Sequence, residues 1–287
     1  MPSLQSIRRR IASVKNTQKI TKAMKLVSAS KLRRAQERVL TARPYAKKMA
    51  EVLGVLGAKT NREYHPLLQK RPVKKIEVMV MTSDRGLCGG FNTNILRRAV
   101  ETLKELKNIA PEIRVNVIGR KGRDFFKRRQ VGIRKEWVGF SDRVSYERAA
   151  EIGKELVEAY LNGAFDEVHM VYGEFRSAIQ TRIVTEKLFP IGDFRQDENE
   201  VEGSFIYEPE EEEVLETLLP RYVEVQIFRG LLESAASEQG SRMMAMDSAT
   251  RNAKDMINRL SLVYNKSRQA SITKELMDIV GGSEALK

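Results

Sequence analysis

The C-terminal part of the chain carries a helical pattern of hydrophobic and polar positions. After Pro220 no proline interrupts it, and Gly230 and Gly240 stand alone before the tail. Mostly apolar or small residues recur every seven positions in two rows offset by three, which is typical of a coiled-coil seam. We therefore expect a coiled-coil helix over residues 209–287. The first row is Leu218, Val225, Leu232, Gln239, Met246, Ala253 and Leu260; the second is Phe228, Ala235, Arg242, Ala249, Met256, Val263, Ala270 and Met277.

Residues 1–58 show the same repeat and predict a second coiled-coil helix, which we expect to form one shaft with the first. Pro44 interrupts the pattern and should kink this helix or remove a hydrogen bond. The alternative is two separate amphipathic helices, each packed on its own globular domain. The rows are Leu4, Ile11, Gln18, Lys25, Leu32, Val39, Ala46 and Leu53, and Ile7, Val14, Thr21, Ser28, Ala35, Ala42, Met49 and Leu56.

Both predicted seams contain polar residues where a stable helix pair would favour leucine. Either other surfaces contact the seams there, or the polar residues specify the register at some expense of stability. They are Gln18, Thr21, Lys25 and Ser28 in one helix and Gln239 and Arg242 in the other.

Between the helices, residues 73–195 predict an α/β domain. Alternating strands and helices favour a mostly parallel sheet covered on both faces. Asn92 is expected to cap the first helix, and the acidic stretch from Gln196 to Glu213 reads as a loop. The expected strands are 76–81, 113–118, 131–138, 167–172 and 179–189, and the expected helices are 92–107, 122–129 and 146–161.

The net charge of +13 is concentrated at the N-terminus. Residues 1–50 hold fourteen Lys and Arg and a single acidic residue, Glu37, whereas the rest of the chain is balanced. Such a helix favours an anionic partner: nucleic acid, acidic lipid headgroups or acidic protein loops. A basic coiled-coil nucleic-acid-binding protein is thus an alternative function. Against it, Tyr45 is the only aromatic residue in this region that could stack on bases.

The glycine-rich loop at residues 84–92 follows a predicted strand, where a dinucleotide enzyme would bind phosphate. Its spacing matches neither the Rossmann fingerprint nor a Walker A motif, so a tight turn is the favoured interpretation. Cys88 has no neighbouring histidine to activate it, and His65 and His169 are too few for a zinc site. A single cysteine also excludes an internal disulfide and fits a reducing compartment. No apolar run is long enough to span a bilayer.

Three segments resemble the γ subunit of F-type ATP synthase. They are the N-terminal run from Ile7 to Lys25, the loop Ser83–Gly89 with the sequence SDRGLCG, and the end of the chain. In the last, Met243–Asn252 and Tyr264–Leu276 carry the resemblance. The chain has no counterpart of the cysteine-bearing regulatory insert of the chloroplast form or of a mitochondrial presequence. We therefore expect a bacterial enzyme without thiol control.

The resemblance implies a rotor without catalytic activity of its own. In the family, the terminal helices form an antiparallel coiled coil inside the α3β3 hexamer. A Rossmann-like α/β domain, inserted between these helices, forms a foot on the c-ring beside the ε subunit. Ion flow turns the ring, and the shaft drives the β subunits through their nucleotide states. The family further implies one copy per complex, no cofactor, no nucleic acid, and a peripheral position at the cytoplasmic face of the bacterial cell membrane.

The resemblance also implies partner-binding residues. Those matching contacts with the hexamer are Arg8, Arg9, Met24, Lys25, Arg85, Cys88, Arg242, Arg268, Gln269, Thr273 and Leu276. Those matching the face towards ε and the c-ring are Phe205 and Tyr207.

Overall fold

The chain divides into two compact units that share two long helices, α1 (Leu4–Lys59) and α5 (Glu211–Ala285). The smaller unit joins Met1–Ser28 with Met243–Lys287, and the larger is Ala29–Arg242. Each helix therefore contributes one segment to each unit. The computed structural model describes residues 3–59, 65–139, 144–178, 180–192 and 210–285.

The larger unit is built on a five-stranded mixed sheet in the order β3-β2-β1-β4-β5. The four strands β1 to β4 are parallel, and β5 pairs with β4 in the antiparallel direction. The strands are β1 (Lys75–Met81), β2 (Glu112–Ile118), β3 (Ile133–Trp137), β4 (Glu167–Phe175) and β5 (Thr181–Phe189); the connecting helices are α2 (Phe91–Leu106), α3 (Arg120–Arg128) and α4 (Tyr146–Leu161).

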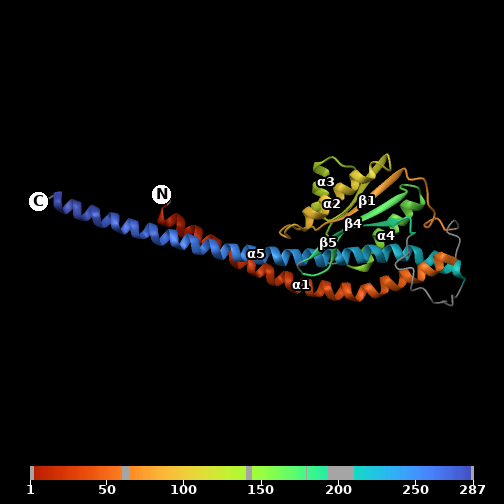
Figure 1. The fold of residues 1–287 in the computed structure, drawn as a ribbon, viewed down its shortest axis with the longest axis horizontal. Coiled ribbons are helices and arrows are strands. Elements are labelled where there is room, and N and C mark those ends of the chain that lie inside the picture. Colours follow the sequence, from red (N-terminus) through yellow and green to blue (C-terminus); the bar gives the residue numbers. More distant parts are fainter. Residues whose placement is uncertain (1–2, 60–64, 140–143, 179, 193–209, 286–287) are drawn as a thin grey trace. The chain divides into compact units, whose positions relative to one another are not determined.

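Helices cover both faces of this sheet (Figure 1). On one face, α2 and α3 enclose a core with Ile76, Val78 and Val80 of β1. On the other, α4 and the first half of α5 pack on Met79 and Met81 of the same strand. This alternation follows from the two-residue period of a strand, which sends successive side chains to opposite faces.

Glu77 is a buried acid on the face covered by α4. Its carboxylate accepts a hydrogen bond from Asn116 Nδ2 at 2.5 Å and lies 2.6 Å from Arg134 Nε. Arg134 also pairs with Glu155 of α4, so the network joins three strands to the helix. Burial raises the pKa of the Glu77 carboxyl, an effect that Arg134 and Asn116 oppose.

The predicted alternation of strands and helices is confirmed, with differences in detail, among them the bounds of α3 and β3. The antiparallel strand begins at Thr181, and β4 continues to Phe175, three residues beyond the predicted end. The predicted helix cap at Asn92 is wrong, because α2 begins at Phe91 with Gly90 at the N-cap. Asn92 instead bonds the backbone and hydroxyl of Ser83, which holds the preceding loop.

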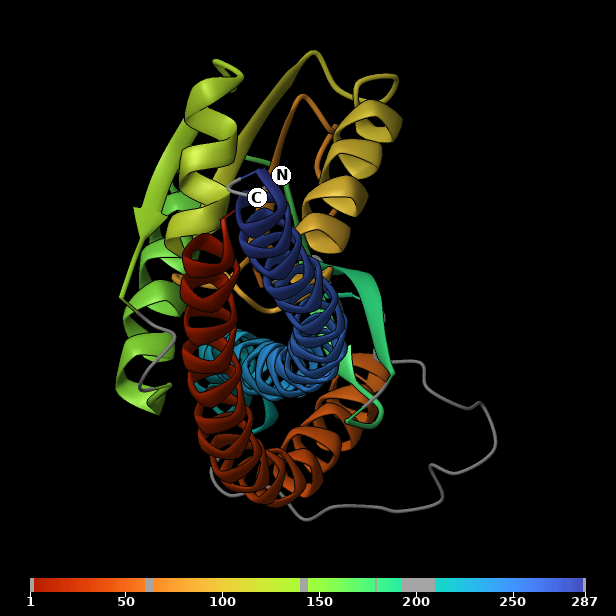
Figure 2. The same cartoon turned by 90° about the vertical axis from the view of Figure 1, so that its left-hand side faces the viewer.

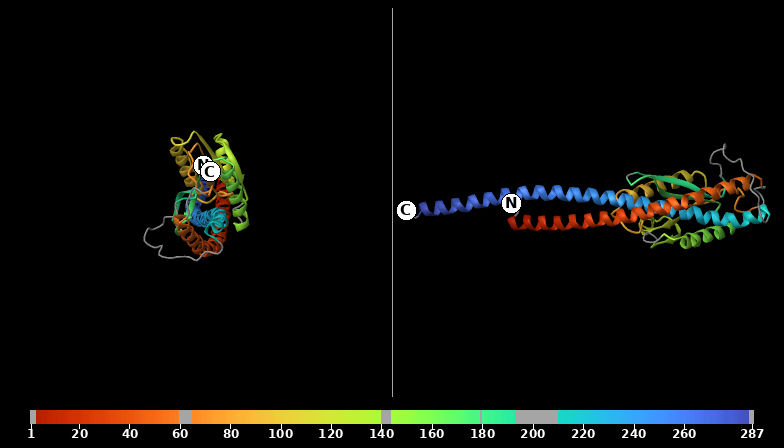
Figure 3. Two further views of the ribbon diagram at one scale, coloured as in Figure 1. Left: turned by 90° about the vertical axis from the view of Figure 1, so that its right-hand side faces the viewer. Right: turned by 90° about the horizontal axis from the view of Figure 1, so that it is seen from below.

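In the smaller unit, residues 4–28 of α1 run antiparallel to α5 (Figures 2 and 3). The buried positions of α1 here are Ile7, Thr21 and Ser28, all from the predicted rows. In α5, Met246 and Ala253 of the first predicted row are buried.

The second predicted row of α5 is wrong in this unit. Met256, Val263 and Met277 are about half exposed or more, although their side chains are apolar. Beside Met256 and Val263, the positions one residue further along, Ile257 and Tyr264, are half-buried in their place. One residue turns a helix by 100°, so the contact with α1 selected between two adjacent rows that the pattern alone could not separate. The observed second row is Thr250, Ile257, Tyr264 and Ser271.

From Tyr222 to Arg242, α5 is enclosed, and no residue of this stretch is exposed. The first turns of the helix bury Leu215, Leu219 and Val223, while Glu216 and Arg221 are exposed. A helix buried all round is normally apolar, but this one also carries buried Glu233, Ser237 and other polar residues. Such groups need hydrogen-bonding partners, and these define the candidate site.

Candidate functional site

The last residues of β4 extend beyond its parallel neighbour. The pairing of β1 with β4 ends at Val80 and Val171, whereas the pairing of β4 with β5 continues to Phe175 and Thr181. The end of β4 thus has a strand on one side only. Its backbone groups on the other side require partners, because an unpaired buried peptide group is costly.

Side chains from both long helices provide these partners. Ser237 of α5 donates its hydroxyl to Gly173 O at 3.1 Å, and Phe175 N donates to Glu233 Oε2 at 2.9 Å. Arg43 of α1 donates through Nη2 to Phe175 O at 3.1 Å. We call residues 172–175, which extend beyond the pairing with β1, the β4 overhang. The two helices take the place of the missing strand along it.

Gly173 allows this close approach. A Cβ atom at Gly173 would lie 3.3 Å from Ser237 Cβ and 3.1 Å from a ring carbon of Phe91. Any larger side chain would have to displace α5 from one side or α2 from the other. Glycine therefore fits this site without displacing its neighbours, which would have to move by a few tenths of an ångström to admit a Cβ atom.

Arg43 and Glu233 form an ion pair at the β4 overhang. Arg43 Nε donates to Glu233 Oε1 at 2.9 Å, and Nη2 lies 2.8 Å from the same oxygen. The Glu233 side chain is 5% exposed, whereas that of Arg43 is 44% exposed. Charged donors and acceptors give shorter, stronger hydrogen bonds than neutral ones. One buried carboxylate thus links α1, α5 and the end of β4.

A second ion pair fixes α5 to the edge strand β5. Arg229 lies 2.5 Å from Glu186 of β5 and donates to the Tyr172 hydroxyl at 3.3 Å. Burial raises the pKa of the Tyr172 hydroxyl, so it stays protonated at neutral pH. Burial alone would lower the pKa of the Arg229 guanidinium, but Tyr172 and Glu186 outweigh it and raise that pKa.

Side chains of the protein itself bond to the glycine-rich loop (residues 84–92). Cys88 is 2% exposed and receives a hydrogen bond from Asn92 Nδ2 at 3.1 Å. Burial raises the pKa of the Cys88 thiol, which disfavours the reactive thiolate. Arg242 is 8% exposed, donates to Gly86 O and pairs with Glu238. Both predicted partner residues, Cys88 and Arg242, are therefore bonded inside the larger unit, while Arg85 is exposed.

The adjacent start of α3 is also capped internally. Asp84 Oδ1 accepts hydrogen bonds from Arg120 N and Gly139 N, each at 3.0 Å. Thr82 Oγ1 accepts from Gly122 N at 2.8 Å. A helix N-terminus that binds phosphate uses such amides, and here a carboxylate and a hydroxyl of the chain already occupy them. The first amides of α3 are therefore satisfied within the chain.

In the smaller unit, polar residues of the two helices bond one another across the seam. The hydroxyls of Thr21 and Thr250 lie 2.8 Å apart, and Lys25 Nζ lies 2.6 Å from Asp247 Oδ1. The hydrogen bond from Lys25 lowers the pKa of the Asp247 carboxyl. Lys25, predicted as a partner contact, thus has a partner in its own chain. These bonds support the interpretation that polar seam residues specify register.

The other predicted contact residues lie on exposed positions or outside the described residues. Arg8, Arg9, Arg268, Gln269 and Thr273 are exposed, and Met24 is half-buried. Leu276 is 57% exposed and is accompanied by other exposed apolar residues. A continuous apolar surface of this kind indicates a contact with another molecule. Its members are Ile272, Leu276, Met277, Ile279 and Val280; Phe205 and Tyr207 lie outside the described residues.

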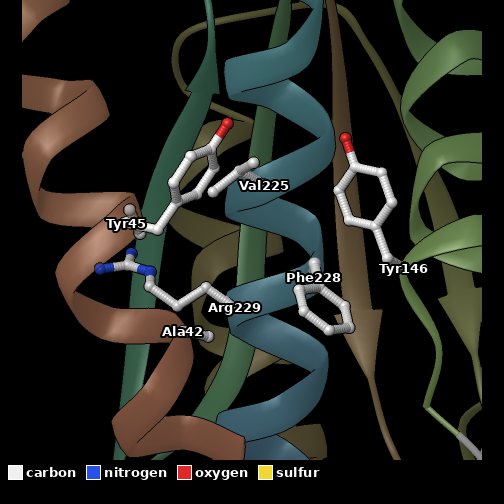
Figure 4. A pocket seen from close by; sticks show the side chains of 7 residues that line it. Ala42, Tyr45, Tyr146, Val225, Phe228 and Arg229 are labelled. Atoms are coloured by element: carbon white, nitrogen blue, oxygen red, sulfur yellow. The ribbon is translucent and has the colours of Figure 1, made fainter.

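A small cavity of about 120 Å³ lies between α1, α4 and α5 (Figure 4). The Tyr146 and Phe228 rings meet edge to face at its wall, with centroids 5.7 Å apart. Its one charged residue, Arg229, is already bonded to Glu186 and Tyr172. The cavity therefore offers no converging catalytic groups. Its walls are Ala42, Tyr45, Ala46, Tyr146, Val225, Phe228 and Arg229.

In the described part of the chain, no three or more His, Cys, Asp or Glu side chains form a cluster suited to a metal ion. No helix of the described residues has the length and apolar character needed to cross a membrane.

The sequence analysis did not identify the residues that join the β4 overhang to the two long helices. Arg43, Gly173, Glu233 and Ser237 belong to no recognisable motif. The only available signal was a set of polar residues within the otherwise apolar first half of the C-terminal helix, and it named no partner.

Comparisons with known proteins agree over the whole chain. The family model described as ATP synthase matches residues 3–286. ATP synthase gamma chains from Geobacter metallireducens and Desulfitobacterium hafniense are 50% and 49% identical, and each alignment covers 100% of both chains.

Solved structures show the same fold. A chain of the Euglena gracilis mitochondrial ATP synthase, in a structure of OSCP, F1 and c-ring, has a TM-score of 0.72 at 22% identity and covers 99% of this chain and 94% of its own. A chain of the Tetrahymena thermophila mitochondrial ATP synthase central stalk and c-ring has a TM-score of 0.61 at 27% identity. It covers 80% of this chain and 99% of its own. This chain therefore belongs to the ATP synthase gamma chain family.

Proposed function

We propose that this chain is the central rotor subunit of a bacterial F-type ATP synthase. The observation that carries the proposal is full-length identity of about half to bacterial gamma chains, without a gap in coverage. In this role the chain catalyses no reaction. It couples rotation of an ion-driven c-ring to conformational change in the catalytic β subunits.

Residues 1–58 and 209–287 would form one antiparallel coiled-coil shaft, with residues 73–195 as a Rossmann-like foot. The two rows of buried positions in the smaller unit support the coiled coil, because they are spaced by alternating three- and four-residue steps. The strand order β3-β2-β1-β4-β5 supports a doubly wound domain.

The exposed surfaces suit a shaft surrounded by partner subunits. The basic N-terminal helix would face acidic loops of the α3β3 hexamer through Arg8 and Arg9, with Met24 and Lys25 nearby. The apolar end of α5 would turn in an apolar bearing formed by the same hexamer. The remaining hexamer contacts would be Arg268, Gln269, Thr273 and Leu276 on α5 and Arg85 with Cys88 and Arg242 near the glycine-rich loop.

The foot would contact the ε subunit and the c-ring through Phe205 and Tyr207. The chain would then be held peripherally at the cytoplasmic face of the cell membrane by its partners, with one copy in each complex. Neither a nucleotide nor a nucleic acid is needed for this role.

Reconstitution tests this function directly. The chain, with the other subunits of F1, should restore ATP hydrolysis and ATP-driven ion pumping to membranes stripped of F1. Exposed Lys107, replaced by cysteine, would carry a fluorescent probe, while buried Cys88 with its raised pKa would label slowly.

Rotation of the probe during ATP hydrolysis is the expected result. Failure of the chain to assemble with α and β would overturn the proposal. Binding of DNA that weakens steeply with salt, without such assembly, would favour the basic nucleic-acid-binding alternative.

A further inference from the structure

The pair formed by Arg43 and Glu233 stands where α1, α5 and the sheet meet. We propose that this pair is a positioning contact that transmits torque between the foot and the two shaft helices. The inference rests on the rotor function proposed above. It assigns to two residues in the interior of the chain a role in coupling that is separate from contact with partner subunits.

The hydrogen bonds of this pair fix the positions of both helices on β4. Arg43 reaches Glu233 Oε1 through both Nε and Nη2, at 2.9 and 2.8 Å, and it also holds Phe175 O. Glu233 in turn accepts the amide of Phe175. Each helix is thereby fixed to the same residue of β4, Phe175. A rotation or slide of either helix against the sheet would break these bonds.

Other directional contacts, such as Arg229 with Glu186 and Ser237 with Gly173 O, join α5 to the sheet without α1, whereas the Arg43–Glu233 pair holds both helices on β4. Around the pair, α5 packs on the sheet mainly through apolar side chains such as Leu231 and Ile227. Apolar burial is non-directional and tolerates small sliding movements. A planar guanidinium that donates in two directions fixes both distance and angle.

Net stability alone does not explain a pair of this kind. Replacing a buried ion pair with well-packed apolar residues is often neutral or stabilising, because both charges lose hydration on folding. Glu233 is almost fully buried and thus carries most of this cost. The pair therefore supplies fixed geometry at the point where three elements join.

The test compares variants in the reconstituted complex. Arg43→Met and Glu233→Ala remove one partner each, whereas Arg43→Lys and Glu233→Gln keep part of the bonding. Arg33→Met is the matched control, because Arg33 lies on the same helix and pairs with Glu37 of its own helix at an exposed site. For each variant, the measurements are ATP hydrolysis and protons pumped per ATP hydrolysed.

We expect Arg43→Met and Glu233→Ala to pump severalfold fewer protons per ATP while hydrolysis stays near the unmutated rate. Arg43→Lys and Glu233→Gln should lose less, and Arg33→Met nothing. A normal pumping ratio in Arg43→Met and Glu233→Ala would overturn the inference. So would hydrolysis and pumping that fall in parallel with the melting temperature, since that is the signature of a purely structural contact.

Hydrogen exchange provides a local readout in the same complexes. Loss of the charged acceptor in Glu233→Ala should speed exchange of the Phe175 amide by about tenfold or more. Unchanged exchange there would show that Glu233 does not hold the end of β4. Failure of the unmutated chain and of Arg33→Met to support pumping would instead overturn the rotor function, and the inference with it.

Discussion

Thr21 shows how a polar residue in an apolar seam is accommodated. It is 8% exposed, and its hydroxyl lies 3.1 Å from Gln18 O and 2.8 Å from the Thr250 hydroxyl. Thr250 also donates to Met246 O. A shift of either helix by one residue would break the hydrogen bond between the two hydroxyls, so the pair favours one register.

A double-mutant cycle measures this pair. Thr21→Val and Thr250→Val should each lower the free energy of unfolding of the chain by about 1 kcal/mol, and the double variant should cost less than the sum. The coupling is obtained from denaturant unfolding followed by the helical signal. Strict additivity would show that the two hydroxyls do not interact.

Asp247 gives a pH-dependent contribution from the same seam. The hydrogen bond and charge of Lys25 lower its pKa below the ordinary value. A lowered carboxyl pKa stabilises the fold above the unfolded-state value, near 3.9, and this stabilisation disappears as the pH falls through the folded-state pKa. In Lys25→Met, the pKa of Asp247 should rise towards its ordinary value.

Side-chain carboxyl NMR can follow that titration in the unmutated chain and in Lys25→Met. Lys22→Met is a suitable control, since Lys22 is exposed and lies about one helical turn before Lys25. An equal shift in both variants would attribute the effect to general charge rather than to the contact.

At the scale of elements, α5 is both a seam helix and part of the α/β core. From Tyr222 to Arg242 it lies against the sheet, and its polar side chains complete the edge of β4 that β1 leaves open. Its packing therefore depends on how far β4 extends beyond β1. The position of Gly173 within the β4 overhang allows the helix to come this close.

Gly173→Val tests this docking. The new side chain would overlap Ser237 and Phe91, and relief of the overlap should cost about 1–3 kcal/mol of unfolding free energy. Gly132→Ala is the control, because a Cβ atom at that glycine meets nothing within 4 Å. Thermal unfolding of both variants should show a lowered midpoint for Gly173→Val alone. Equal midpoints would mean that the overhang tolerates a side chain.

At the scale of the whole molecule, charge and apolar surface are distributed unequally. Residues 1–50 hold all of the excess positive charge, while the end of α5 presents exposed apolar residues such as Ile272 and Met277. Neither surface is explained by folding of the chain alone. Both are what a rotor requires if acidic and apolar surfaces of other subunits surround it.

The charge can be separated from the fold by substitution. Arg8, Lys15 and Lys22 are exposed, so their replacement by glutamine should change the unfolding free energy by no more than about 0.5 kcal/mol each. Association with α3β3 should nevertheless slow and lose much of its dependence on salt. Lys25 is left intact because Asp247 is its partner.

The matched control replaces Lys104, Lys107 and Lys121, three exposed lysines of the larger unit, with the same loss of charge. Stopped-flow measurements over a range of salt concentrations should separate the two sets. An equal loss of association rate in both would indicate that net charge, rather than the N-terminal helix, attracts the hexamer.

The sequence alone determined the elements, the family and the first seam row, because these depend on local periodicity and on contiguous motifs such as Ser83–Gly89. For the polar seam residues Thr21 and Lys25 it left two roles open, contact with other surfaces or specification of register. Only the tertiary structure showed that Ile257, and not Met256, belongs to the row that faces α1. Both side chains are apolar and adjacent in sequence, so the pattern alone does not distinguish them. The tertiary structure alone also revealed the contact of Arg43 with Glu233, 190 residues away, because no local pattern encodes which distant side chain will complete a strand.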